Sequence, residues 1–361
     1  MIPIQKENRS PASARRFVLG LLATFATLTA FPASAQPDGL TNNGNHNGFT
    51  QGNGNHNGFT NGNGNPNGTV PVTTIVKNLV FPPEYMYASP AAINDSGVVA
   101  GNYYDSNFLS HGLVYNKGVI QTFDVPSSTF TVLQGISSDG SVGGMVNAYS
   151  NSFVFQGGTT WDLNDYSPAT YYNQFRNISQ HGPALSSSWR SPGGYLHVLF
   201  SGGVITPLAD PINLPPGNYY TYLYMPVAVN SQGSVVGYLG SGGPPVPGYQ
   251  IGNTWTQLPP LPPPYEYVTN YAIADTGDIY LGVQQYIDSA YPHDMLYKHT
   301  PGSTGWVRIN FPGDTTGTIS LRLATNGLCT RADGQLFMVG WYYSDTVPFT
   351  AFIAGPSDAT F

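Results

Sequence analysis

Paired tyrosines are the residues of this sequence that best suit ligand binding. The chain has 25 Tyr, 18 Phe and 5 Trp among 361 residues. Successive side chains of a strand point to opposite faces, so the two rings of a pair cannot share one face. A ring exposed among Asn and Ser can stack on and hydrogen bond to a sugar or a protein partner. We predict a ligand-binding role, with loop packing as the alternative, for Tyr103, Tyr104, Tyr219, Tyr220, Tyr342 and Tyr343.

Aspartates beside Gly-rich turns are a second candidate for chemistry. Asp95, Asp139, Asp275 and Asp333 each stand within two residues of a turn glycine. A hard cation needs about six converging oxygens, whereas each of these turns offers one carboxylate. Asp also favours turns through bonds from its side chain to the local backbone. We expect these aspartates to form turns and predict no metal site.

Two histidines occupy the same place in different repeats. His111 and His293 each precede a tyrosine by four residues, at Tyr115 and Tyr297, but other repeats carry Asn, Leu or Pro there. A ring of histidine ligands is therefore broken. We expect a structural hydrogen bond at the start of a strand rather than a metal ligand or a general base.

Motifs for catalysis are absent from the sequence. It contains no Gly-x-Ser-x-Gly elbow, zincin helix or P-loop. Asp162 and Asp165 could be imagined as a carboxylate pair for glycoside cleavage, but nearness in sequence does not set the separation across a sugar ring. We predict neither a catalytic residue nor a cofactor.

The elements that must position these residues are short strands. From about residue 73 onward, Val, Ile, Tyr, Phe and Thr form short runs between Gly, Pro, Asn, Asp and Ser clusters, with no helical period. A hairpin typified by AINDSGVVAG at 92–101 recurs, followed by an aromatic strand, a glycine turn and a strand ending near proline. The intervals between marker glycines are 42 to 57 residues, which fits four-stranded propeller blades. The markers are Gly97, Gly140, Gly182, Gly233, Gly277 and Gly334.

The two ends of the repeat region complement each other. The last unit stops after the aromatic strand TAFIAG, while TTIVKNLVF at 73–81 matches the missing fourth strand. A split repeat closes a ring and removes exposed strand edges, whereas an open solenoid has no such need. We predict an all-β fold, a six-bladed β-propeller in which the N-terminal strand completes the last blade.

The hairpin pattern carries a resemblance. An IN-x-x-G hairpin, a VVG strand, a His-Gly-Leu-x-Tyr-like strand and a strand ending in Asp-x-Pro resemble the HAF-type extracellular repeat of bacterial exported proteins. The match is clear in AINDSGVVAG with SHGLVYNKGVIQTFDVP and in AVNSQGSVVGY, and it spans residues 73–361. It departs in the third and fifth units, where PALS and DIYLG replace the VVG strand. The resemblance implies a secreted propeller-like repeat protein and implies no catalytic residues.

The N-terminal region predicts export. Residues 1–35 combine basic residues, the apolar run FVLGLLATFATLTAF and a final Ala-Ser-Ala, as in a secretory signal peptide. Residues 36–72 are an Asn/Gly-rich segment with NHNGFT repeats, which we expect to be a disordered spacer before the propeller at 73–361. Cys329 is the only cysteine, so an intramolecular disulfide is impossible and we expect a buried thiol.

The net charge of the chain limits the classes of partner that it is expected to bind. The formal net charge is −7, and removing residues 1–35 takes away four basic residues and one acidic residue, leaving −10. An acidic chain repels phosphates, so we expect neither nucleic acid nor membrane insertion after signal cleavage. The leading hypothesis is a secreted, extracellular or periplasmic, non-enzymatic binder of a glycan or protein partner. A glycan hydrolase or lyase acting at the channel mouth and a structural surface component stay open as alternatives.

Overall fold

The computed structural model describes residues 75–147, 151–166, 170–190, 194–211, 223–240, 245–262, 267–286, 292–309, 320–344 and 347–361. The expected signal peptide at 1–35 and spacer at 36–72 lie outside these residues. The described part contains 24 strands and one short 3-10 helix, η1 at Leu163–Tyr166. The prediction of an all-β fold is confirmed.

Four of the sheets are separate four-stranded antiparallel blades. The first holds β6 (Thr131–Ile136), β7 (Val142–Val146), β8 (Asn151–Gln156) and β9 (Thr159–Asp162). The second holds β10 (Thr170–Ile178), β11 (Ala184–Arg190), β12 (Gly194–Ser201) and β13 (Val204–Pro207). The third holds β14 (Leu223–Val229), β15 (Val235–Gly240), β16 (Val246–Ile251) and β17 (Thr254–Gln257). The fourth holds β18 (Tyr267–Ile273), β19 (Ile279–Tyr286), β20 (Pro292–His299) and β21 (Val307–Ile309).

The fifth sheet has eight strands in the order β1-β24-β23-β22-β2-β3-β4-β5. It joins strands from both ends of the described chain. Its N-terminal members are β1 (Ile75–Asn78), β2 (Met86–Ile93), β3 (Val99–Tyr104), β4 (Ser110–Asn116) and β5 (Val119–Phe123). Its C-terminal members are β22 (Ser320–Thr330), β23 (Leu336–Ser344) and β24 (Val347–Gly355).

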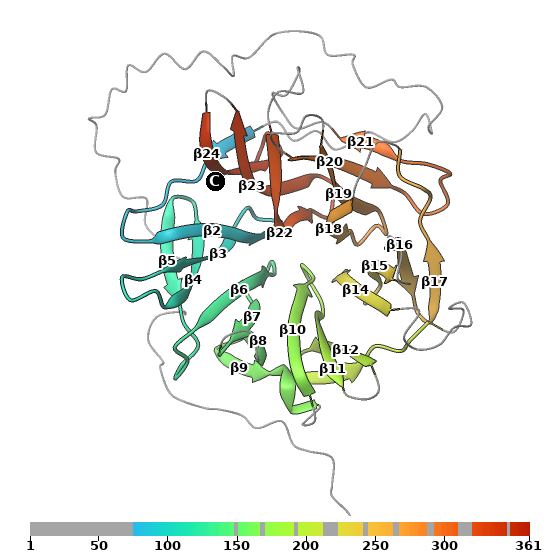
Figure 1. Cartoon of the computed structure of the whole chain (residues 1–361), viewed down its shortest axis with the longest axis horizontal. Coiled ribbons are helices and arrows are strands. Elements are labelled where there is room, and N and C mark those ends of the chain that lie inside the picture. Colours follow the sequence, from blue (N-terminus) through green and yellow to red (C-terminus); the bar gives the residue numbers. More distant parts are fainter. Residues whose placement is uncertain are drawn as a thin grey trace, which may run out of the picture. The chain divides into compact units, whose positions relative to one another are not determined.

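The sheets follow one another around a common centre, in a propeller-like arrangement (Figure 1). The first strand of each group contacts the first strand of the next, in the order β2, β6, β10, β14, β18, β22 and back to β2. Hydrophobic clusters fill the spaces between neighbouring sheets. In one of them Phe123 of β5, Leu133 of β6 and Phe153 of β8 pack together. Burying a side chain of this size contributes about 1.5–3 kcal/mol, so packing between sheets supplies much of the stability.

The recurring hairpin has a physical explanation in its asparagine. The Asn94 Oδ1 accepts hydrogen bonds from the backbone N–H groups of Ser96 (3.0 Å) and Val98 (2.9 Å), which shapes the turn. Its Nδ2 donates to the carbonyl of Ser137 in the next sheet (2.9 Å). Asn230 repeats both roles, donating to the carbonyl of Ala274 (3.1 Å). The same side chain therefore forms the hairpin and ties neighbouring sheets together.

Five of the six marker glycines have a positive φ, as hairpin turns of this type require. Gly182 differs, because a Cβ there would lie 2.8 Å from the backbone of Ser231 in the next turn. Close approach of two turns, rather than backbone conformation, explains that glycine. Asp139 and Asp333 accept hydrogen bonds from the backbone N–H groups two residues on, as expected of turn formers.

A buried asparagine crosses the middle of the ring. The Asn326 Nδ2 donates to the carbonyls of Gln134 in β6 (2.5 Å) and Arg176 in β10 (2.9 Å). Its Oδ1 accepts from Asn177 of β10 (3.1 Å). The ladder between β22 and β23 is interrupted between Leu323 and Leu328, which frees Asn326 for these bonds. They fix β22 relative to two other sheets.

The N-terminal strand pairs with the C-terminal strand. β1 runs antiparallel to β24, from Ile75 opposite Gly355 to Asn78 opposite Phe352. The Lys77 ammonium donates to the carbonyl oxygen of Phe361 (2.9 Å), and the Tyr342 hydroxyl donates to Asn78 (2.8 Å). Both ends of the described region are thereby held in one sheet.

No helix in the described ranges is both long and apolar enough to cross a membrane.

Candidate functional site

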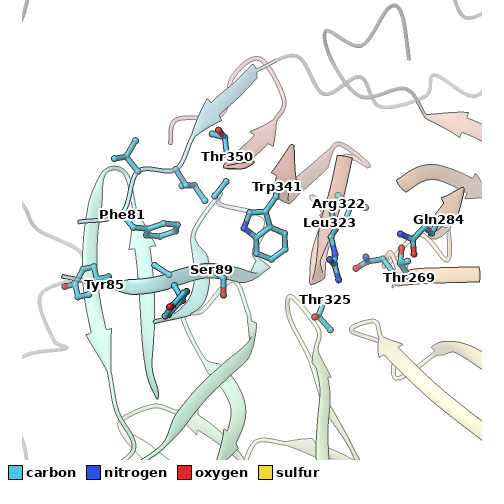
Figure 2. Close-up of a pocket in the computed structure, with 16 residues that line it drawn as sticks. Phe81, Tyr85, Ser89, Thr269, Gln284, Arg322, Leu323, Thr325, Trp341 and Thr350 are labelled. Carbon is cyan, nitrogen blue, oxygen red and sulfur yellow. The ribbon is translucent and has the colours of Figure 1, made fainter. Parts of the chain in front are cut away.

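A groove of about 970 Å³ lies where segments from three parts of the ring approach one another (Figure 2). The loop before β2 and β2 itself form one side, β18 and β19 form another, and β22, β23 and β24 complete it. Four aromatic rings line the groove: Phe81, Tyr85, Tyr87 and Trp341. Its hydroxyl and amide groups belong to Ser89, Thr269, Asn270, Gln284, Thr325 and Thr350, as well as to Tyr85 and Tyr87.

The aromatic side is built by a proline turn and an irregular strand. The backbone N–H of Tyr85 donates to the carbonyl of Pro82 (3.0 Å), which closes a turn and places Tyr85 beside the groove. Two residues later Tyr87 has a φ of 53° and is 75% exposed. The ladder between β2 and β3 is interrupted between Met86 and Ser89, so this backbone is not held by regular pairing. A positive φ at a bulky residue costs about 1–3 kcal/mol and is typical of functional positions.

Trp341 and Arg322 lie side by side because of the register between β23 and β22. They are directly opposed residues of β23 and β22, so their side chains leave the same face of the sheet. Trp341 is half-buried and packs with Phe81 against one hydrophobic cluster. Arg322 is exposed and forms no ion pair or side-chain hydrogen bond with another described residue. The lining therefore includes an aromatic ring next to an unpaired guanidinium.

The opposite wall is formed by amides of two strands. Asn270, with its amide nitrogen turned towards β22, donates to the carbonyls of Ala324 (2.6 Å) and Thr325 (2.8 Å). The Thr269 hydroxyl donates to the carbonyl of Gly282 (3.1 Å). Gln284 is 7% exposed, and its side chain hydrogen bonds to no other described residue. The Gln284 amide thus lines the groove, open to solvent, without a side-chain partner among the described residues.

The predicted tyrosines of β3 lie behind the groove rather than in its lining. Tyr103 is 8% exposed, its ring centroid is 4.3 Å from that of Tyr85, and burial raises the pKa of its phenol. Tyr104 meets Tyr87 edge to face, with ring centroids 6.3 Å apart. Both predicted tyrosines therefore contact rings that line the groove.

The other predicted tyrosines are not brought to the groove lining. Tyr342 leaves the face of β23 opposite to Trp341, and its ring lies 6.1 Å from that of Phe352. Only the backbone of Tyr343, in β23, is described. Tyr219 and Tyr220 lie outside the described residues. A ligand-binding role for the six tyrosines stays a prediction.

Sequence reasoning missed Tyr85, Tyr87, Trp341, Arg322 and Gln284. A signal for three of them was present in the aromatic runs YMY at 85–87 and WYY at 341–343, in which neighbours along the strand face opposite sides. The predicted residues include Tyr342 and Tyr343 of the second run and no residue of the first. Nothing in the sequence around Arg322 or Gln284 marks them as candidates, because they line the groove only where segments far apart in the chain come together.

The histidines take structural positions. His111, near the start of β4, has its Nδ1 2.9 Å from Asp124, and its ring is stacked on Tyr103 with a centroid distance of 5.1 Å. His197 is buried in β12 and bonded to Ser187 and to the carbonyl of Tyr224. Burial lowers the pKa of His197 to about 4, so it is neutral at physiological pH. The side chain of His293 lies outside the described residues.

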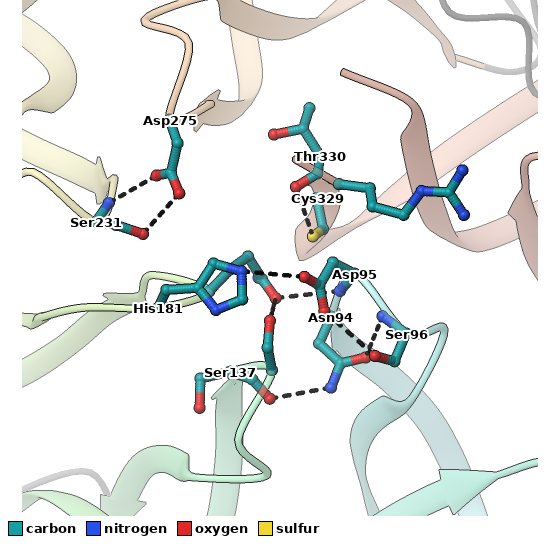
Figure 3. A network of polar contacts seen from close by, with 12 residues as sticks. Asn94, Asp95, Ser96, Ser137, His181, Ser231, Asp275, Cys329 and Thr330 are labelled. Atoms are coloured by element: carbon teal, nitrogen blue, oxygen red, sulfur yellow. Dashed lines mark hydrogen bonds and ion pairs between the residues drawn. The ribbon is translucent and has the colours of Figure 1, made fainter. Parts of the chain in front are cut away.

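The hairpin turns gather polar groups at another part of the ring (Figure 3). His181 lies 3.3 Å from the carboxylate of Asp95, and Asp275 accepts from the backbone and hydroxyl of Ser231 (2.8 Å each). Cys329 is buried as expected, and burial raises the pKa of its thiol. Within the described ranges no three His, Cys, Asp or Glu side chains are grouped as metal ligands would be. These contacts connect the turns of different sheets.

Of the two aspartates considered as a carboxylate pair, Asp162 has a local structural role. The Asp162 Oδ1 accepts from the backbone N–H of Asn164 (2.8 Å) at the start of η1. The side chain of Asp165 lies outside the described residues.

Comparisons with known proteins end at distant structural likeness. No protein-family model matches the chain, and no curated relative matches it. Among solved structures, AofleA from Arthrobotrys oligospora is 14% identical with a TM-score of 0.44, covering 77% of this chain and 86% of its own. A six-bladed β-propeller lectin from Aleuria aurantia is 13% identical with a TM-score of 0.39 (78% and 99% covered). The polysaccharide lyase Uly1 is 10% identical with a TM-score of 0.39 (75% and 77%). These likenesses are too remote to indicate a ligand, so a ligand has to be inferred from the residues that line the groove.

Proposed function

We propose that this protein is an exported, non-enzymatic six-bladed propeller that binds a glycan in the groove between β2, β18–β19 and β22–β24. The observation that carries the proposal is the lining itself. It combines aromatic rings, hydroxyls and amides with one exposed guanidinium. Sugars offer C–H faces that stack on aromatic rings and hydroxyls that pair with amides, so this mixture suits them.

The six-bladed architecture is supported by how the eight-stranded sheet divides. Its two halves, β2–β5 and β22–β24 with β1, meet at a single parallel bridge between Ala92 and Asn326. Each half then has four strands, like the other sheets. The pairing of β1 with β24 supports closure of the ring by the N-terminal strand.

Export and the family resemblance rest on the sequence. The basic, apolar and small-residue stretches of 1–35 support a secretory signal, and residues 36–72 suit a spacer. The HAF-type resemblance gains a physical basis from the paired roles of Asn94 and Asn230, although it stays a proposal. A secreted glycan-binding protein would have all three features: a signal peptide, a spacer and extracellular repeats.

Binding is favoured over hydrolysis by the side chains in the groove. Glycoside cleavage commonly uses two carboxyl groups on either side of the scissile bond. None of the described lining residues is Asp, Glu or His. We therefore propose that the groove holds a glycan without cutting it.

The test is a glycan array probed with the purified protein, with product formation measured in parallel. Tyr87→Ala and Trp341→Ala should each weaken binding roughly tenfold, the effect of losing about 1.4 kcal/mol at a buried contact. Phe108→Ala is the matched control, because Phe108 is also an aromatic residue with positive φ and is 67% exposed, but it does not line the groove. Product formation, or equal losses in all three variants, would refute the proposal.

A further inference from the structure

Arg322 is the single charged side chain among the described residues that line the groove. The described structure pairs it with no carboxylate, although the chain has 19 acidic residues against 12 basic ones. Lys298 is paired with Asp278 at 2.9 Å and Arg331 with Asp358 at 3.0 Å, whereas Arg308 is exposed like Arg322 but lies outside the groove. Arg322 therefore combines an unpaired guanidinium with a place in an aromatic-lined groove.

The surroundings of Arg322 fix what it can reach. Trp341 stands directly across the β22–β23 ladder, and Gln284 and Thr269 face the groove from the neighbouring sheet (Figure 2). Gln284 is more than nine-tenths buried and lacks a side-chain partner among the described residues. The amide is open to the groove, so a ligand hydroxyl can take the place of water on it. Two polar side chains without protein partners thus line the same groove as an aromatic ring.

These groups select among sugars. A guanidinium presents its N–H donors in a planar fork that matches the two oxygens of a carboxylate. An amide such as that of Gln284 both donates to and accepts from hydroxyls, and an indole such as that of Trp341 stacks on the face of a sugar ring. A neutral sugar would leave Arg322 without its best partner.

We propose that the groove recognises a carboxylate-bearing sugar, a uronic acid, with its carboxylate on Arg322, a ring hydroxyl on Gln284 and its ring face on Trp341. This inference rests on the proposed function, because it names the class of glycan bound at the same groove. The net charge of −7 disfavours a densely charged polyanion. A glycan with sparse uronic acids fits a groove whose described lining has one cation.

The experiment compares two matched probes by calorimetry with the full chain. One is a xylo-oligosaccharide carrying a single glucuronic acid branch, and the other is the same oligosaccharide with that carboxyl reduced to an alcohol. We expect the acidic probe to bind at least about tenfold more tightly, as a charge-assisted hydrogen bond implies. Arg322→Gln should remove this preference, so that the two probes bind within about twofold of each other. Arg308→Gln, an exposed arginine outside the groove with the same change of charge, should keep the preference.

Each other outcome overturns a defined claim. Equal binding of both probes to the wild type would refute the uronic acid and leave the glycan-binding proposal standing. Binding of neither probe, together with a silent neutral array, would refute both. Tight binding of a singly sulfated xylo-oligosaccharide in place of the uronic acid would replace carboxylate with sulfate and refute the inference as stated. Loss of the preference in Arg308→Gln would show that net charge, not the groove, is responsible.

Discussion

Replacing Asn326 tests whether the hydrogen bonds across the ring hold the sheets together. The side chain is 6% exposed and makes three bonds, to the carbonyls of Gln134 and Arg176 and to the amide of Asn177. Asn326→Leu keeps the approximate size of the side chain but leaves all three partners without it. We expect a marked loss of stability, because those partners stay largely shielded from water.

The magnitude follows from the partners left unsatisfied. Each buried group without its hydrogen bond costs about 1–3 kcal/mol, and the three share one site, so their costs do not add in full. We expect a loss of roughly 3–5 kcal/mol in the free energy of unfolding. For a domain of this size, that corresponds to a fall in Tm of roughly 6–10 °C.

The assay is thermal and denaturant unfolding of the wild type and three variants. Asn326→Asp keeps the acceptor for Asn177 but places a carboxylate against two carbonyls, so it should destabilise at least as much. Asn107→Leu, at an exposed turn, is the control and should change the free energy by less than about 0.5 kcal/mol. If Asn326→Leu lowered Tm no more than that control, the bonds across the centre would carry no stability and the reasoning would fail.

Three further predictions concern strain, pH and ring closure. Tyr87→Asn should keep the free energy of unfolding or raise it by up to about 1 kcal/mol, since Asn tolerates a positive φ, while the affinity for glycan falls. Phe108→Asn should have the same effect on stability and no effect on glycan affinity. Loss of stability in both variants would contradict the strain argument. Because burial lowers the pKa of His197 to about 4, below its unfolded value near 6.5, stability should decrease as the pH falls between these values, by at most about 3 kcal/mol. His197→Gln should flatten that part of the pH profile in denaturant titrations, and an unchanged slope would assign it to other groups. Deleting Ile75–Asn78 should lower Tm by several degrees because β24 loses its partner, and unchanged melting would exclude ring closure by β1.

The sequence alone was enough for the strand class and the hairpins, because their causes are local. The turn at Asn94–Gly97 depends on a side chain that bonds to N–H groups two and four residues away and on a glycine with φ of 76°. Such requirements recur with each repeat and are visible as a pattern. Burial of Cys329 was also predictable, since a lone cysteine in a chain of strands behaves as a small apolar residue.

The groove was decided only by the tertiary structure. Tyr85, Gln284, Arg322 and Trp341 come from different sheets or strands and are separated by up to 256 positions in the chain. Which member of an aromatic run faces the groove depends on strand register, so Trp341 lines it and Tyr342 packs on the opposite face. Whether a polar group is satisfied depends on every segment that surrounds it. The repeated local contacts are therefore readable from the chain, whereas the binding surface exists only where the ring brings unlike parts of the repeats together.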